Sequence, residues 1–496
     1  EVMQTGQLFK QIAAESGLDH PQTQRLWQTL WQVVQQGAHS LSQLYQWLQT
    51  KRHALIEFLR QLGPTNNLSR SEWLALAMAA GLMMGQASQP FLAQAADSAG
   101  SEFQVNSYTT SYQTSASVGL DAEGDFVVVW QSANDQDGSV FGIYAQQYNA
   151  SGTAQGGEFQ VNSYTTGNQT RPSVGVDAEG DFVVVWESDG QDGDSGSIYA
   201  QLYNASGSTV GTEFKVNSYT TGSQSRPNVG MDRDGDFVIA WSSLGQDGNN
   251  QGIYAQLYNA SGSTVGTEFK VNSYTTGSQR TPSVGMDADG NFVVAWQSDT
   301  QDGSNYGIYA QRYNVSGTAQ GDEFKVNSYT TSYQTSPSIG MDAEGDFVVA
   351  WQSYTQDGSG FGIYAQRYNA SGTAQGDEFK VNSYTTGTQS SPSVGMDSDG
   401  DFAVVWRSGD FTTGQDGSHG GIYAQRYNLS GSEQGSEFLV NSYTTNQQIS
   451  PSVGMDSDGD FVVAWESYTQ DTDNYGVYAQ RYTVPKETYL PVIHKS

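Results

Sequence analysis

Apolar and polar residues recur along this chain in units of 55 or 56 residues, with one interval of 59. Residues 283–298, SVGMDADGNFVVAWQS, represent one unit, and close copies occur seven times. The tryptophans that mark the register are Trp130, Trp186, Trp241, Trp296, Trp351, Trp406 and Trp465. Self-similarity at this period is typical of propellers and solenoids.

Two strands are predicted at the start of each unit. SVGMD and FVVAW flank the turn formers at 288–291, which indicates a β-hairpin. Under two-residue alternation both faces of FVVAW are apolar, with Trp296 on one and Ala295 on the other. A strand that is apolar on both faces needs a packing partner on each side.

Two further strands complete the unit. GIYAQRYN alternates Tyr309 and Gln311 against Ile308 and Ala310, which predicts a third strand that is more exposed. EFKVNSY, at residues 323–329, predicts a short fourth strand. Four short antiparallel strands per unit, repeated seven times without capping repeats, favour a seven-bladed β-propeller over a solenoid.

The ends of the repeat array predict how the ring closes. The array begins with a lone fourth strand at Glu102–Tyr108 and ends after a third strand at Gly476–Tyr482. We therefore expect the first segment to pair with the last blade, which would leave few open strand edges. The propeller domain is predicted over residues 97–483, followed by a tail at 484–496.

Residues 1–96 have a different composition, rich in Gln, Leu, Ala and Trp. Leu26, Trp27, Leu30 and Trp31 recur at helical spacing, so we predict an α-helical module for assembly or anchoring. Segment 70–95 allows three interpretations: a buried helix, a signal-like segment or a short anchor. Any membrane contact is expected only through residues 73–88.

Charge and cysteine content narrow the function classes. The chain has 52 acidic and 21 basic side chains and a net charge of −31. The excess acid lies after residue 96, and such a field disfavours nucleic acid and anionic lipid as partners. There are no cysteines, and Ser, Thr, Asn, Gly and Tyr are abundant. This composition fits an extracellular or cell-surface protein.

The hairpin turns carry the pattern Asp-x-Asp-Gly-Asp, whose alternate oxygens superficially resemble a calcium loop. The distal carboxylate of an EF-hand is missing, and Asp and Gly also suit a tight turn. We interpret the pattern chiefly as turn chemistry, with calcium as the alternative and no other cofactor expected. The possible calcium ligands are Asp232, Asp234, Asp236, Asp456, Asp458 and Asp460.

Binding residues are expected where the seven copies differ. The loops joining the second strand to the third, and the fourth to the next first strand, should share one face. Exposed aromatic residues among amides and charges suit glycan or protein recognition. The candidates are Tyr112, Arg171, Arg226, Arg280, Tyr333, Tyr354, Phe361, Arg407, Phe411, His419 and Tyr468.

The order Pro, Val-Gly, Met-Asp-x-Asp-Gly-Asp, Phe-Val-Val-Ala-Trp over residues 101–483 resembles the NHL-type propeller repeat. It is still more similar to bacterial repeats carrying FVVAWQS, QDG and GIYAQRYNASG in large secreted and surface proteins. The resemblance implies a propeller and, for activity, mostly binding. The chain has Trp where the NHL repeat commonly has Asp, so ligand residues are not transferred.

The sequence thus predicts a protein that is not an enzyme. Sevenfold near-symmetry should give every copy of a residue the same surroundings, whereas a general acid and a general base need different ones. We expect a structural or binding propeller whose N-terminal helices mediate self-association or attachment to a protein partner. A surface lectin or adhesin that binds glycans is one alternative, and a polysaccharide-active enzyme is another.

Overall fold

The computed structural model describes residues 97–133, 136, 138, 140–410 and 414–484. The expected helical module at 1–96, its segment 70–95, Phe411 and the tail from 485 lie outside the described residues. Within the described residues no helix is long and apolar enough to cross a membrane.

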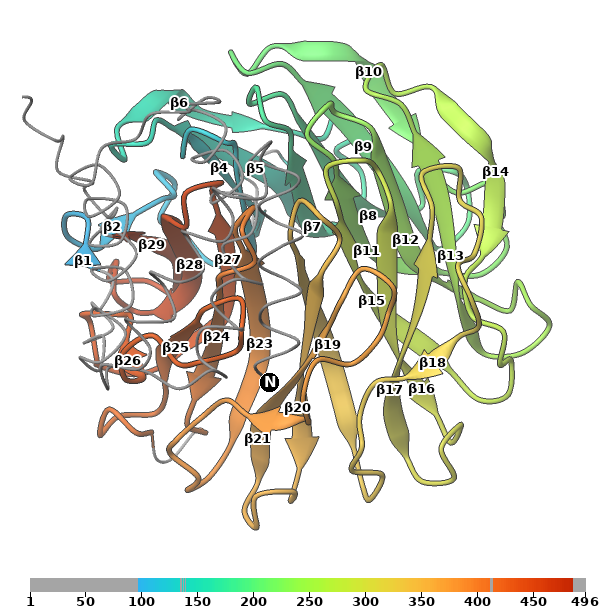
Figure 1. Cartoon of the computed structure of the whole chain (residues 1–496). Coiled ribbons are helices and arrows are strands. Elements are labelled where there is room, and N and C mark those ends of the chain that lie inside the picture. The colour runs from blue at the N-terminus through green and yellow to red at the C-terminus, as the bar shows by residue number, and fades with distance from the viewer. Residues whose placement is uncertain (1–96, 134–135, 137, 139, 411–413, 485–496) are drawn as a thin grey trace, which may run out of the picture. The chain divides into compact units, whose positions relative to one another are not determined.

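Seven antiparallel sheets are arranged around a common axis, as the sequence predicts (Figure 1). The first three blades have a fourth strand of seven residues. Blade 1 contains β3 (Gln113–Leu120), β4 (Phe126–Ala133), β5 (Phe141–Tyr148) and β6 (Ala154–Gln160). Blade 2 contains β7 (Gln169–Val176), β8 (Phe182–Asp189), β9 (Gly196–Tyr203) and β10 (Thr209–Lys215). Blade 3 contains β11 (Gln224–Met231), β12 (Phe237–Leu244), β13 (Gln251–Tyr258) and β14 (Thr264–Lys270).

In the next three blades the fourth strand is only two residues long. Blade 4 contains β15 (Gln279–Met286), β16 (Phe292–Asp299), β17 (Tyr306–Tyr313) and β18 (Phe324–Lys325). Blade 5 contains β19 (Gln334–Met341), β20 (Phe347–Tyr354), β21 (Phe361–Tyr368) and β22 (Phe379–Lys380). Blade 6 contains β23 (Gln389–Met396), β24 (Phe402–Ser408), β25 (Gly421–Tyr427) and β26 (Phe438–Leu439).

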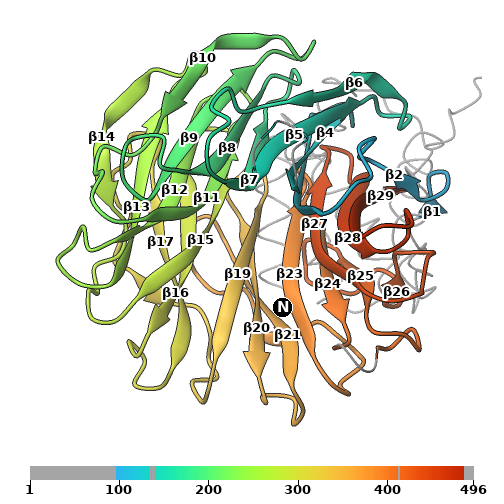
Figure 2. The same cartoon turned by 180° about the vertical axis from the view of Figure 1, so that it is seen from behind.

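Blade 7 is completed by the start of the propeller, which confirms the predicted closure. It contains β27 (Gln448–Met455), β28 (Phe461–Tyr468) and β29 (Tyr475–Thr483), and β29 pairs with β1 (Asp97–Ser98) and β2 (Phe103–Gln104). Phe103 lies opposite Ala479, and the Val105 N–H donates to the Val477 carbonyl at 2.8 Å. Figure 2 shows β1 and β2 beside β29.

The core lies between blades. Trp296 is fully buried, and its side of β16 packs against Val238, Ala240 and Ile253 of the preceding blade. The opposite side of β16, with Val293 and Ala295, packs against the next blade. The two apolar faces predicted for the second strand therefore each meet a neighbouring sheet.

The third strand, predicted to be more exposed than the second, is only slightly so in blade 4, where two residues of β17 and one of β16 are partly exposed. In β17 only Tyr306 and Arg312 are partly exposed, and Gln311 is buried. The Gln311 amide donates to the carbonyls of Arg312 and Gly321, so its polarity is satisfied inside the protein.

Each inner hairpin is closed by its first aspartate. Asp287 Oδ1 accepts the N–H groups of Asp289 at 3.0 Å and Asn291 at 2.8 Å. Gly290 has φ +81°, a left-handed conformation that suits glycine. These hairpins and the turns after the third strands form one side of the ring, the hairpin face, as the bond from Ala150 N–H to Asp125 shows.

Candidate ligand-binding face

The remaining loops form the opposite side of the ring, which we call the loop face. It carries the loops from second to third strand and from fourth strand to the next first strand. Their backbones are bonded directly, as between Asp189 N–H and the Asn168 carbonyl at 2.8 Å. The predicted sharing of one face is confirmed.

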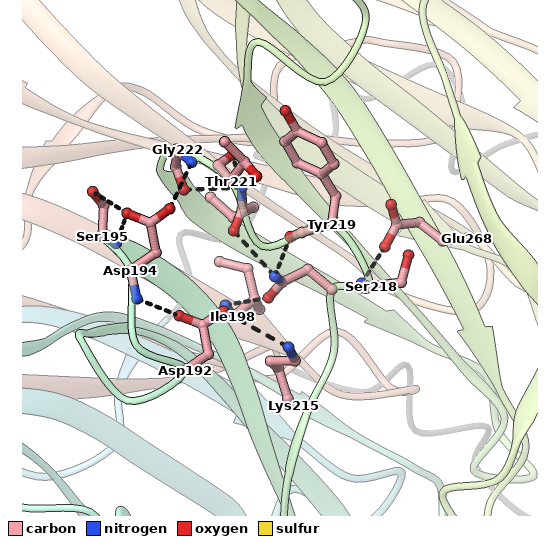
Figure 3. Close-up of polar contacts among 12 residues, drawn as sticks. Asp192, Asp194, Ser195, Ile198, Lys215, Ser218, Tyr219, Thr221, Gly222 and Glu268 are labelled. Atoms are coloured by element: carbon pink, nitrogen blue, oxygen red, sulfur yellow. Dashed lines mark hydrogen bonds and ion pairs between the residues drawn. The ribbon is translucent and has the colours of Figure 1, made fainter.

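Polar contacts fix these loops to each other and to the next blade (Figure 3). Asp194, between β8 and β9, accepts the N–H of Gly222 at 3.2 Å. Glu268 of blade 3 accepts the N–H of Ser218 at 2.6 Å. Lys215 Nζ lies 3.7 Å from Asp192 Oδ2. The loop face is therefore a firmly held surface on which variable side chains are displayed.

Three arginines come from the first strands of three consecutive blades. Arg171 and Arg226 occupy left-handed positions, with φ 53° and 57°, at the bulge of β7 and of β11. Arg280 lies one residue earlier in the equivalent part of β15. First strands of neighbouring blades contact one another around the axis, so these arginines lie at the inner part of the loop face.

The electrostatics connect the three guanidinium groups. Arg171 Nη1 forms an ion pair with Glu187 at 2.6 Å, while half of its side chain stays exposed. Surrounding protein atoms, and then the positive charges of Arg171 and Arg280, lower the pKa of Arg226. Glu187 offsets part of this effect. Three positive charges held close together repel one another, and a bound anion would relieve this repulsion.

Aromatic residues flank the arginines. The Arg280 guanidinium lies 4.7 Å from the centre of the Tyr306 ring, a cation–π contact. The Tyr306 ring in turn lies 6.3 Å from Tyr333, which is 42% exposed. This arrangement offers a charge-recognising group beside an accessible ring.

A second aromatic cluster forms where blades 7 and 1 meet. Tyr475 lies 5.0 Å from Tyr468 and 6.3 Å from Tyr112, measured between ring centres. Burial, and then the charge of Glu466, raise the pKa of Tyr475, while Arg407 lowers it. Tyr354 and Phe361 form a separate pair at 5.0 Å in blade 5, and His419 is exposed in blade 6. The predicted site residues are thus divided among several groups on one face.

The position directly after each tryptophan was predicted as a site residue only in blade 6, as Arg407, and not in the other six blades. At this position the side chain bridges neighbouring blades: Gln131 accepts the Arg171 N–H, and Glu466 accepts the Ser115 N–H at 2.8 Å. Burial raises the pKa of Glu466 to about 7. An alignment of the seven copies would have shown that this position varies. Its residues are Gln131, Glu187, Ser242, Gln297, Gln352, Arg407 and Glu466.

The possible calcium ligands lie on the hairpin face. Asp232 Oδ1 is engaged by the N–H groups of Asp234 at 3.0 Å and Asp236 at 2.9 Å, and Asp456 binds Asp458 and Asp460 in the same way. In the described part of the chain no group of three or more His, Asp or Glu is suited to hold a metal ion. Turn chemistry accounts for these contacts, and calcium binding stays a prediction.

A search of known protein families finds no match to the chain, and neither does a search of curated proteins. Solved structures with the fold include a protein of unknown function from Dyadobacter fermentans, with 10% identity and a TM-score of 0.47, covering 78% of this chain and 98% of that one. The polysaccharide lyase Uly1 has 10% identity and a TM-score of 0.46, with 80% and 96% covered. An α-L-arabinanase of Penicillium chrysogenum, complexed with arabinobiose, has 13% identity and a TM-score of 0.42, with 76% and 97% covered.

The prediction that the protein is not an enzyme is corrected, because its premise of equal surroundings at equivalent positions fails within this chain. Glu187 forms an ion pair with Arg171, whereas Glu466 is buried with a raised pKa. Equivalent positions therefore have different surroundings despite the repeats. At these identities the likeness concerns the fold alone.

Proposed function

We propose that the loop face binds an anionic glycan, with Arg171, Arg226 and Arg280 recognising its negative charge. The observation that supports this proposal is the placement of three arginines on consecutive blades. Such a group of positive charges stands out in a chain whose net charge is −31. Guanidinium groups form paired hydrogen bonds with carboxylates and sulfates. Tyr306 and Tyr333 supply the aromatic surface on which a sugar ring packs.

The test measures binding of a uronate-containing oligosaccharide and of a neutral one by calorimetry. Arg226→Gln and Arg280→Gln should each weaken binding of the acidic ligand at least tenfold. Arg233→Gln is the matched control, because Arg233 lies in a hairpin-face turn with 65% of its side chain exposed. Equal affinity for the neutral ligand, or unchanged affinity in both variants, contradicts the proposal.

A second candidate function is cleavage of the bound glycan. It is favoured by Tyr475, which lies within electrostatic reach of Glu466 and Arg407 and donates to Gln447 Oε1 at 3.3 Å. Unlike ionisable groups close together are what acid–base chemistry requires. Release of new sugar ends by the wild type, abolished in Tyr475→Phe, supports this function. Binding without release over prolonged incubation opposes it.

The second part of the proposal concerns residues 1–96. We propose that they attach the propeller to a protein partner or to further copies of the chain, and that the protein is extracellular or on the cell surface. The aromatic and leucine spacing of the sequence supports it. Removing residues 1–96 should leave a soluble propeller and abolish assembly, as measured by light scattering. A full chain that is monomeric, and that captures no partner from its native cell surface, contradicts this part.

A further inference from the structure

Clefts open on the hairpin face between blades 1 and 2, between blades 4 and 5, and between blades 5 and 6. The residue just before the tyrosine near the end of the third strand, such as Arg312 before Tyr313, extends toward the turn that follows the next blade's third strand. The turn's glycine leaves room for it, because a Cβ at Gly372 would lie 2.8 Å from the side chain of Arg312. The residues at this position are Gln147, Leu202, Leu257, Arg312, Arg367, Arg426 and Arg481.

In blades 4, 5 and 7 the chain places an arginine across the boundary with the next blade. Arg312 Nη1 donates to the Ser371 carbonyl at 2.7 Å, and Arg367 Nη1 donates to the Leu429 carbonyl at 2.7 Å. Arg481 binds the Ala150 carbonyl in the same way. The cleft that contains Arg312 has a volume of about 210 Å³, and the one that contains Arg367 about 40 Å³.

The cleft between blades 1 and 2 lacks this arginine. Gln147 replaces it and donates to the Ala205 carbonyl at 3.1 Å. Val176 stands where the other two clefts have Met341 and Met396. The resulting cavity measures about 370 Å³, and the rings of Phe126 and Tyr148 form part of its wall.

Charge distinguishes this cleft as well. Its lining contains four carboxylates, Asp121, Glu123, Asp125 and Glu179, and no Lys or Arg. The cleft with Arg312 is lined by two carboxylates, Asp287 and Glu344, together with that arginine. Burial, and to a lesser degree Asp125, raise the pKa of Asp121, so a bound cation would relieve this crowding.

We propose that the cleft between blades 1 and 2 binds an alkyl guanidinium group, the side chain of an arginine supplied by a ligand. The equivalent clefts of the same chain show the group in place, with its hydrogen bond to a turn carbonyl. The cleft lies on the face opposite the arginine cluster, so its ligand and that of the proposed glycan site are independent.

The test titrates L-argininamide into the full chain by calorimetry, with L-lysinamide as the point-charge comparison. One argininamide should bind per chain, and lysinamide should bind at least threefold more weakly, because a guanidinium presents a planar set of donors. Acetyl-Gly-Arg-Gly-amide represents an arginine borne by a protein, and argininamide a free guanidine compound. If neither L-argininamide nor acetyl-Gly-Arg-Gly-amide binds, the proposal is overturned.

Gln147→Arg should fill the cleft from within and abolish binding. Arginine at this position is compatible with folding, as four other blades show. Glu123→Gln combined with Glu179→Gln retains the cavity and should weaken binding at least tenfold. Arg312→Gln is the matched variant elsewhere in the ring and should create a second, weaker site. Binding that is unchanged in Gln147→Arg and in the double variant overturns the proposal.

Discussion

Glu102 and Ser442 are separated by 340 residues, yet the Glu102 carboxylate accepts the Ser442 backbone N–H at 2.6 Å. Its other oxygen accepts the side-chain amide of Gln470. Glu323 makes the same two contacts inside the ring, with Ser273 and Gln301. The glutamate of the repeated Glu-Phe pair is therefore a latch that holds the outer strand of a blade to the loop entering that blade, and Glu102 applies it in blade 7, whose outer strand is not covalently continuous with β29.

Removal of this latch should loosen blade 7 selectively. Glu102→Ala loses three charge-assisted hydrogen bonds at a partly exposed site, which we expect to cost about 1–2 kcal/mol of unfolding free energy. Amide hydrogen exchange should rise at Val477 and Ala479, whose strand pairs with β2. Glu323→Ala is the control. Equal exchange at β29 in both variants would show that the closing strand does not depend on Glu102.

A second prediction concerns pH. Burial raises the pKa of Glu466 to about 7, above the ordinary value of a glutamate. The folded state therefore binds a proton more tightly than the unfolded state, so stability falls as pH rises from about 4.5 to 7. Glu466→Gln, which mimics Gln131 and Gln352, should remove this loss and gain about 1–3 kcal/mol at pH 8 relative to wild type.

The two proteins should unfold with nearly equal free energy at pH 4.5, where the glutamate is protonated. Other buried carboxylates, such as Asp397, are unchanged in the variant, so the difference between the two curves isolates Glu466. Urea unfolding across this pH range measures it. A constant difference at every pH would contradict the raised pKa.

Backbone strain gives a third prediction. Ser336 has φ 55° at the bulge of β19, a conformation that costs a non-glycine residue about 1 kcal/mol. Ser336→Gly should therefore raise the unfolding free energy by roughly 0.5–1 kcal/mol. Thr335→Gly, one residue earlier and outside the left-handed region, should lower it instead. Thermal unfolding distinguishes the two, and destabilisation by both would argue against strain at the bulge.

A fourth prediction separates stacking from charge at the loop face. Tyr333→Ala should weaken glycan binding by about 0.5–2 kcal/mol while leaving its salt dependence unchanged, since a ring contact carries no charge. Arg280→Gln should weaken binding and also reduce the salt dependence. Val140→Ala serves as a control for loss of an exposed apolar side chain on this face. Affinities at two salt concentrations provide the measurement.

Much of the fold was predictable because its determinants are local. Hairpin chemistry and the two-faced apolar strand around Trp296 each depend on a few adjacent residues, and their recurrence along the chain gave the number of blades. The missing fourth strand at one end and the spare one at the other predicted that Glu102–Tyr108 pairs with the last blade, and the structure places Phe103 opposite Ala479. The burial of Gln311 was not predictable from alternation, because it depends on carbonyls that only the folded turn brings within reach.

The candidate site was predictable only in part. Differences among copies pointed to the loop face and to Arg171, Arg226 and Arg280. They did not reveal that Glu187 lies against Arg171, because that contact joins the first and second strands of a folded blade. In the sequence Glu466 differs from its counterparts Gln131 and Gln352 only by a carboxylate in place of an amide. Its raised pKa arises from enclosure between blades 7 and 1, a property of the closed ring.

The closing strand has a consequence for synthesis on the ribosome. β1 and β2 emerge before any blade, yet β29, their partner, is made more than 370 residues later. Throughout translation of six blades their backbone groups have no sheet to join, and a neighbouring nascent chain could supply one. Exchange of this segment between two chains would join their propellers without a new contact, so dense translation on one messenger should favour linked dimers.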